Sequence, residues 1–309
     1  MISSTFQRGA AIAAALALLF ALFGWAAPVS ALGSAKASPN DALLIVNKTT
    51  NELAYFRDGV LERVFPVATG KTEDLTPEGT FPIVNKIVDR PYYKEKIPGG
   101  DPANPLGRRW LGLRVGKTEG TTYAIHGNNN SRSIGKYVSA GCIRMHNDDI
   151  EWLFKQIAVG TKVVITSSKL SFEELAAKHR YELLRPFPAS LLVDGVAHEL
   201  RRTMLVYRGV TYLPLRECFE LLGGTVQWDA ASRTATVLFA SSVIALQPGA
   251  TAALADGEEA ALGSPARLVN GALMVPLRDM AALAGWTAQW DAESRSVVLT
   301  GAASDPSLF

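Results

Sequence analysis

The chain has 309 residues, of which 48% are apolar and 19% charged, and its formal net charge is +2. This composition suits a soluble globular protein, and the length allows about one to three domains with a sizeable core. A charge so near zero, without a long Lys/Arg run, excludes nucleic acid as the main partner.

The N-terminal segment reads as a targeting signal. Arg8 is the lone charge before the apolar run AIAAALALLFALFGWAA, and small residues follow at Val29 and Ala31. We expect a signal peptide over residues 1–31, cleaved after Ala31. Because the apolar run is long, an uncleaved membrane anchor remains an alternative. Either way, the rest of the protein is expected to be extracytoplasmic, secreted or held in the cell wall.

After a short linker at residues 32–40, the chain becomes rich in strands. A helix is expected from Asp148, with Glu151 completing a capping box. The pattern predicts a mainly β domain over residues 41–168, a β sandwich with one packed helix. The strands that alternation and turn signals predict are residues 42–47, 52–57, 60–68, 121–126 and 162–167.

A second domain follows a junction. Residues 169–188 read as a linker that contains a short helix and ends in the stiff sequence RPFP. Residues 189–301 then form a smaller α+β domain made of two copies, because the sequence from 209 matches that from 271 without a gap. Residues 302–309 are a tail.

Each copy predicts a strand, a helix that begins with Pro-Leu-Arg, and a strand that carries Gln-Trp-Asp. The repeated Trp228 and Trp290 are interpreted as core anchors, with ligand stacking as the alternative. Cys218 corresponds to Met280 in the other copy and is expected to be a buried small hydrophobe.

The other cysteine, Cys142, raises a chemical question. Exported proteins usually pair their cysteines, yet the only other one lies in a different domain. An unpaired thiol becomes a nucleophile when a base or a cation lies beside it. Of the four histidines, His126 ends an apolar strand and is the best candidate base, although a strand-end histidine without function stays open. The remaining histidines, in the helix approach, the linker and the repeats, are His146, His179 and His198.

The residues around Cys142 add two further elements. Consecutive backbone N–H groups of Ala140, Gly141 and Cys142 could hold the oxyanion of a tetrahedral intermediate. Arg144 offers a planar fork of donors for a carboxylate. A base, a nucleophile, oxyanion donors and a carboxylate clamp form a set that is less expected by chance than any member alone.

This set resembles the active-site signature of the L,D-transpeptidases, the family with a YkuD-type catalytic domain. The resemblance covers roughly residues 41–168 and implies a β-rich fold. The motifs that carry it are HG at 126–127, SAGCIR at 139–144, TPEGTF at 76–81, NPLG at 104–107 and RMHNDDIEWLF at 144–154.

The resemblance implies a role for each site residue. Cys142 would be the acylated nucleophile and His126 the proton acceptor and donor, with the carbonyl of Gly127 orienting the imidazole. Arg144 and Ser139 would bind the substrate. Many members have histidine where this chain has Ala140, and alanine suffices if that position acts only through its N–H.

The implied reaction is acyl transfer in cell wall biogenesis. The thiolate would attack a peptidoglycan stem tetrapeptide and release D-alanine, and an amine acceptor would then form a 3–3 cross-link. Water as acceptor would give an L,D-carboxypeptidase instead. The family also implies acylation by carbapenem-type β-lactams, and no cofactor is expected.

The C-terminal repeats resemble the copper amine oxidase N-terminal-like domain. A copper site normally needs several imidazoles, and this region holds only His198, so we expect no metal there. The repeats are expected to hold the enzyme at the cell wall. Two alternatives remain: a metal-dependent hydrolase using His126, Cys142 and His146, and a wall-binding protein without catalysis.

Overall fold

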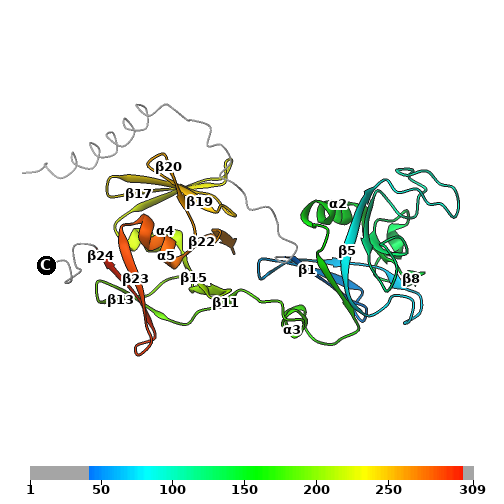
Figure 1. Ribbon diagram of the computed structural model, residues 1–309, viewed down its shortest axis with the longest axis horizontal. Helices are drawn as coiled ribbons and strands as arrows, with labels where there is room; N and C mark the ends of the chain where they lie inside the picture. Colours follow the sequence, from blue (N-terminus) through cyan, green and yellow to red (C-terminus); the bar gives the residue numbers. More distant parts are fainter. Residues whose placement is uncertain (1–41, 302–309) are drawn as a thin grey trace, which may run out of the picture.

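The computed structural model describes residues 42–301 (Figure 1). The predicted signal peptide at 1–31, the linker at 32–40 and the tail at 302–309 lie outside the described residues. Within the described part, no helix combines the length and the apolar character that a bilayer crossing requires.

The N-terminal domain is built on one eight-stranded sheet with the order β3-β2-β1-β10-β5-β6-β7-β9. The central strand β1 is buried along its whole length, and it pairs in parallel with β10 and antiparallel with β2. A two-stranded pair, β4 with β8, lies beside this sheet. The strands are β1 (Ala42–Asn47), β2 (Glu52–Arg57), β3 (Val60–Pro66), β4 (Thr69–Gly70), β5 (Gly79–Val88), β6 (Arg109–Leu113), β7 (Tyr123–His126), β8 (Tyr137–Ser139), β9 (Ile143–Arg144) and β10 (Lys162–Thr166).

The sheet curls around one apolar core. Side chains from β1 and β2 meet side chains from β6, β7 and β9 in that core, which α2 (Asn147–Gln156) covers with Ile150 and Leu153. Strand β5 pairs with β10 through its first residues and with β6 through its later ones. The register shift between Ile83 and Asn85 lies at this change of partner, and such an irregularity increases local twist. The mainly β fold predicted from sequence is confirmed.

The start of α2 differs from the prediction. The helix begins at Asn147, its N-cap is His146, and no side chain caps it, so the expected capping box of Asp148 and Glu151 is wrong. The side chain of Asn147 is used elsewhere, as described below.

The segment at residues 169–188 packs against both domains. Its helix α3 (Phe172–Lys178) begins with a capping box at Ser171 and packs Leu175 and Ala176 on the outer face of the N-terminal sheet. At the other end, β11 (Arg185–Pro186) pairs with the first sheet of the repeat domain. The short helix expected within 169–188 is present, and most of this segment packs on one domain or the other.

The repeat domain holds three further sheets, with orders β11-β14-β15-β22-β21, β13-β12-β24-β23 and β16-β17-β18-β19-β20. The first strands of the two copies, β15 and β22, pair antiparallel at its centre. Its other elements are β12 (Ser190–Val193), β13 (Val196–His198), β14 (Leu205–Tyr207), β15 (Val210–Pro214), α4 (Leu215–Leu221), β16 (Thr225–Asp229), β17 (Thr234–Phe239), β18 (Ser242–Leu246), β19 (Ala252–Ala255), β20 (Glu258–Ala261), β21 (Arg267–Val269), β22 (Ala272–Pro276), α5 (Leu277–Leu283), β23 (Trp286–Asp291) and β24 (Ser296–Gly301).

The tip of the β2–β3 hairpin contacts the repeat domain. Both turn residues, Asp58 and Gly59, have positive φ, as the Asp-Gly signal predicts. Arg267 donates to the Asp58 carbonyl at 2.9 Å, and the N–H of Leu184 donates to the Gly59 carbonyl at 2.9 Å. A Cβ at Gly59 would lie 2.5 Å from the ring of Tyr207, so a side chain there would disturb this contact.

The two repeated tryptophans do not anchor the core. Trp228 is 39% exposed and Trp290 48% exposed, whereas Cys218 is 1% exposed and packs in the core of the domain. The prediction for Cys218 is confirmed and the core-anchor interpretation of the tryptophans is wrong. The alternation of strands β16 and β23 turns these rings outward.

Candidate active site

The register of β7 against β9 determines which side chains meet. The two strands are parallel, with Ile125 opposite Ile143 and His126 opposite Arg144. Side chains on a strand alternate between faces, and both isoleucines enter the core. His126 and Arg144 therefore project from the other face. Cys142 directly precedes β9, in the loop that leads into this pairing.

His126 is held by the main chain. Its ring is buried, and Nδ1 lies 2.7 Å from the Gly127 carbonyl oxygen. In the neutral ring this contact places the proton on Nδ1 and leaves Nε2 as an acceptor. Burial lowers the pKa of His126 to about 4, assisted by the guanidinium groups of Arg144 and Arg90, while the Gly127 carbonyl acts in the opposite direction.

Cys142 is a free, partly exposed thiol. Its sulfur donates to the Thr122 carbonyl at 3.4 Å. Burial of the sulfur raises the pKa of the Cys142 thiol, while the N–H of Ala124 and the charges of Arg144 and Arg90 act to lower it. With the pKa of the imidazole lowered and that of the thiol raised, both groups are uncharged near neutral pH in this conformation.

The turn after His126 is braced by Asn147, which sequence reasoning did not single out. Its side chain accepts from the Asn128 N–H and donates to the Asn128 carbonyl, both at 3.0 Å. A Cβ at Gly127 would lie 2.3 Å from the Asn147 oxygen, and one at Gly107 would lie 2.7 Å from it. Both glycines are needed for this close approach, which explains why the NPLG turn belongs with the HG motif.

A second residue that the sequence did not reveal is Arg90. Its guanidinium lies 3.8 Å above the ring of Trp110, and that ring stacks on His126 with centroids 5.4 Å apart and planes 12° apart. The three side chains form a column that fixes the plane of the imidazole. Because they come from separate strands and loops, no local motif could have indicated the column.

One short segment connects this column with Cys142. The three successive carbonyls of residues 120–122 accept hydrogen bonds from Trp110, Arg90 and Cys142, at 2.9, 3.0 and 3.4 Å respectively. The segment therefore links the position of the thiol to that of the column.

The loop before Cys142 uses part of its own hydrogen-bonding capacity. Ser139 is buried, and its hydroxyl accepts from the Gly141 N–H at 3.0 Å and donates to the Cys142 carbonyl at 2.7 Å. These two hydrogen bonds brace the loop. The substrate contact of Ser139 and the oxyanion role of the Gly141 N–H stay predictions. The N–H groups of Ala140 and Cys142 make no hydrogen bond within residues 42–301.

Gly141 itself is required by the backbone. It has a φ of +130°, and a Cβ there would lie 2.6 Å from the Leu75 carbonyl oxygen. The loop is held from the same side by Thr76, whose hydroxyl donates to the Gly141 carbonyl at 3.0 Å. The TPEGTF segment thus supports the nucleophile loop.

Two guanidinium groups offer donors next to the sulfur. Nε of Arg144 and Nη1 of Arg90 are buried and have no hydrogen-bond partner among the described residues. Buried donors without partners are rare in folded proteins, and such donors suit an anionic group brought by a ligand.

The arrangement that the metal alternative needs is absent from residues 42–301, where no three His, Cys, Asp or Glu side chains lie close enough to hold a metal ion. His146 lies at the N-cap of α2 instead. The same finding bears on copper in the repeat domain. With His198 as its only imidazole, the residues there do not fit a copper site.

Comparison with known proteins identifies the families that the two domains match. Residues 41–165 match the L,D-transpeptidase catalytic domain, and residues 192–299 match the copper amine oxidase N-terminal domain. The putative L,D-transpeptidase YqjB of Bacillus subtilis is 51% identical over 163 residues, which are 52% of this chain and 92% of that relative. The chain therefore belongs to the L,D-transpeptidase family.

Other relatives match a smaller share. The putative L,D-transpeptidase YkuD of Bacillus subtilis is 42% identical over 33% of this chain and 52% of its own length. Among solved structures, the catalytic domain of the Enterococcus faecium L,D-transpeptidase acylated by ertapenem covers 40% of this chain and 96% of its own, with 22% identity and a TM-score of 0.32. L,D-transpeptidase 3 of Mycobacterium tuberculosis gives 20% identity and a TM-score of 0.32 over 40% of this chain and 60% of its own.

Proposed function

We propose that this protein is an exported cysteine acyltransferase that makes 3–3 cross-links between peptidoglycan stem peptides. The observation that supports the proposal is the β7–β9 register, which brings His126 and Arg144 to one face of the sheet, directly after the loop that carries Cys142. Membership of the L,D-transpeptidase family supplies the reaction class.

In the first step, Nε2 of His126 takes the thiol proton as the sulfur of Cys142 attacks the carbonyl before the terminal D-alanine of a stem tetrapeptide. A thioester forms, the C–N bond breaks, and His126 returns the proton to the departing amine of D-alanine. The N–H groups of Cys142 and Ala140 stabilise the oxyanion of the intermediate. Alanine suffices at position 140 because only its main chain is used.

In the second step, an amine of a neighbouring stem attacks the thioester. His126 removes the amine proton and returns a proton to the sulfur as the C–S bond breaks, which regenerates the free thiol. Water in place of the amine would hydrolyse the same thioester, and the enzyme would then act as an L,D-carboxypeptidase.

The two guanidinium groups explain how an uncharged pair becomes reactive. A stem peptide brings carboxylates that satisfy Nε of Arg144 and Nη1 of Arg90, the two donors without partners. This contact positions the peptide over the sulfur and excludes water, so that proton transfer to His126 takes place only in the complex. The proposed site of action is the cell wall, outside the cytoplasm.

The first experiment is acylation by a carbapenem, followed by intact mass. Incubation of the purified chain should add one inhibitor mass, and the adduct should map to Cys142. Cys142→Ala should give no adduct, whereas the matched control Cys218→Ala should be labelled like the wild type. An unlabelled wild type, or equal labelling of Cys142→Ala, would remove the nucleophile assignment.

Disaccharide tetrapeptide then separates the two acceptors. A transpeptidase releases D-alanine and forms a cross-linked dimer, whereas a carboxypeptidase releases D-alanine and leaves only the tripeptide. Mass spectrometry of the products distinguishes them, and we expect the dimer.

A further inference from the structure

The repeat domain carries two clefts that occupy equivalent places in its two copies. One has a volume of about 690 Å³ and the other about 760 Å³. Each is formed by the start of a helix and the Gln-Trp-Asp strand of one copy, together with the turn and first strand of the other copy. That turn and strand are residues 271–273 in the first cleft and 209–211 in the second. The equivalent parts are α4 with β16 in the first cleft and α5 with β23 in the second.

The equivalence holds residue by residue. Arg216 and Trp228 line the first cleft, and Arg278 and Trp290 line the second at the matching positions. In both clefts an acid at the helix start supports the adjoining loop: Glu217 accepts from the Arg202 N–H at 3.2 Å, as Asp279 accepts from the Gly263 N–H at 3.0 Å. The same cleft has thus been built twice.

Each cleft presents an exposed tryptophan. Such a large apolar ring is usually mostly buried, yet Trp228 is 39% exposed and Trp290 48% exposed. The ring of Trp290 also contacts Phe187, with centroids 5.2 Å apart. An exposed ring that lines a cleft is a suitable platform for the flat, C–H-rich face of a sugar ring.

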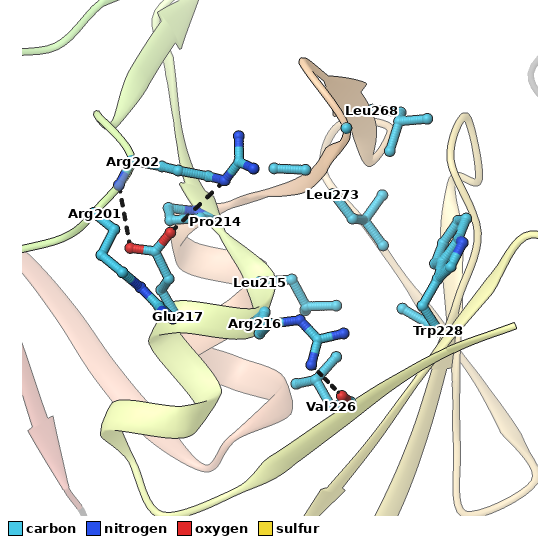
Figure 2. A pocket seen from close by; sticks show the side chains of 13 residues that line it. Arg201, Arg202, Pro214, Leu215, Arg216, Glu217, Val226, Trp228, Leu268 and Leu273 are labelled. Carbon is cyan, nitrogen blue, oxygen red and sulfur yellow. Dashed lines mark hydrogen bonds and ion pairs between the residues drawn. The ribbon is translucent and has the colours of Figure 1, made fainter. Parts of the chain in front are cut away.

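The first cleft differs from the second in charge. Figure 2 shows Trp228 with Leu268 and Leu273 at one end, Arg216 between them and the helix, and Arg201 and Arg202 at the other end. At the positions of these last two arginines, the second cleft has Gly263 and Ser264. The first cleft therefore combines an apolar platform with a cationic end, and the second keeps mainly the platform.

The arginines are held in place rather than neutralised completely. Arg216 donates to the Val226 carbonyl, and Nη1 of Arg202 donates to the Asn270 carbonyl at 3.1 Å. Arg201 and Arg216 share one carboxylate, that of Glu220, at 3.3 and 3.6 Å. With Glu217 set against Arg202 at 3.9 Å, three guanidinium groups face two carboxylates, so the cleft keeps a net positive charge for an anionic ligand.

We propose that the first cleft binds a glycan strand of amino sugars that carry free carboxylate groups, the peptidoglycan backbone at positions from which stem peptides have been removed. A sugar ring lies on Trp228, and a carboxylate on the same strand meets Arg201 and Arg202, whose planar donor forks suit it. The second cleft holds a further sugar of the same polymer, since duplicated sites favour a ligand that itself repeats. This inference rests on the proposed function for the identity of the polymer.

The test uses the full chain and glycan strands from which an amidase has removed the stem peptides, so that the lactyl carboxylates are free and the catalytic site has no peptide to hold. We expect the wild type to bind these strands and to bind a neutral chito-oligosaccharide of equal length at least about tenfold more weakly. Added salt should reduce this difference, because it screens exposed charges.

Four variants sharpen the test. Trp228→Ala and the double variant Arg201→Gln/Arg202→Gln should each weaken binding at least about tenfold, and Trp228→Phe should recover part of it. Trp290→Ala should have a smaller effect. The control is Arg233→Gln/Arg295→Gln, which removes the same charge from exposed positions that line neither cleft and should bind like the wild type.

Equal binding by the wild type, Trp228→Ala and the double variant would overturn the proposal. So would binding to whole cell walls that disappears once their phosphate-containing polymers are stripped off. Carbapenem labelling of Cys142 in the same samples keeps the two proposals apart: loss of glycan binding with normal labelling concerns the cleft alone, and normal glycan binding without labelling concerns the catalytic proposal alone. An unchanged thermal midpoint shows that each variant is folded.

Discussion

The two cysteines of this chain differ in exposure and in their neighbours: Cys142 is partly exposed and Cys218 is buried. Cys218 packs on α4 among apolar side chains, and burial, with the charge of Glu217, raises the pKa of its thiol. Burial raises the pKa of Cys142 too, yet the charges of Arg144 and Arg90 and the N–H of Ala124 act to lower it. The set of neighbours distinguishes the two thiols, because burial alone acts on both pKa values in the same direction.

The largest effect should come from removing the base. His126→Ala should lower kcat/KM for cross-linking by about 10³-fold, within the range that general base catalysis contributes. His146→Ala should stay within about threefold, since that ring lies at a helix N-cap outside the column. Steady-state rates on disaccharide tetrapeptide check both variants. A His126→Ala enzyme that keeps most of its rate would contradict the assignment.

A smaller effect is expected from Arg90, as a positioning residue. Arg90→Gln should lower the rate of carbapenem acylation about tenfold, because it removes the guanidinium above Trp110 and a charge that favours the thiolate. Arg90→Lys should recover only part, since an ammonium keeps the charge but loses the planar stack. Arg108→Gln, at an exposed ion pair with Asp89, is the matched control.

The pH profile separates this role from a structural one. Loss of the Arg90 charge should move the pKa of Cys142 up, and also that of His126, because the cation disfavours the imidazolium. An Arg90→Gln enzyme that is slower but has an unshifted profile would indicate that Arg90 only supports the fold.

The smallest effect concerns the thiols themselves. A thiol with a raised pKa has less thiolate at any given pH, so alkylation of Cys142 by iodoacetamide should be a few-fold slower at pH 7 than that of free cysteine, with its inflection above the usual ~8.5. Cys218 should stay unlabelled until the protein is unfolded. An inflection below that value would mean that a thiolate–imidazolium pair exists before substrate binds.

The lowered pKa of His126 also predicts how kcat/KM depends on pH. Because the pKa of His126 is lowered to about 4, the imidazole is a neutral base at any pH above that value. The acid limb of kcat/KM should therefore fall near pH 4 and not near the ~6.5 of an ordinary histidine.

Local sequence was sufficient where the chemistry is local. Cys142, its loop and Arg144 lie within six residues, and the contact between His126 and the Gly127 carbonyl, which the family resemblance implied, is present. The Asp-Gly turn and the short apolar runs likewise predicted the β2–β3 hairpin, because turn residues with positive φ have few alternatives.

Long-range packing decided the rest. Arg90 and Trp110 reach His126 from other strands, and neither carries a local signal of a role. The hydrogen bond from the Gly141 N–H to the Ser139 hydroxyl was not predictable either, because sequence does not show which polar groups a loop uses within itself. The outward position of Trp228 was also not predictable, because a large apolar residue in a strand is normally expected to face the core.

The sequence by itself determined the family, the candidate site residues Cys142 and His126 and the internal duplication, since these depend on contiguous motifs and on a repeat that aligns without a gap. Only the tertiary structure decided the strand register that puts His126 and Arg144 on one face, the column above the imidazole and the two tryptophan clefts. The physical reason is that pairing and packing between distant segments set which side chains become neighbours, and no spacing along the chain encodes that directly.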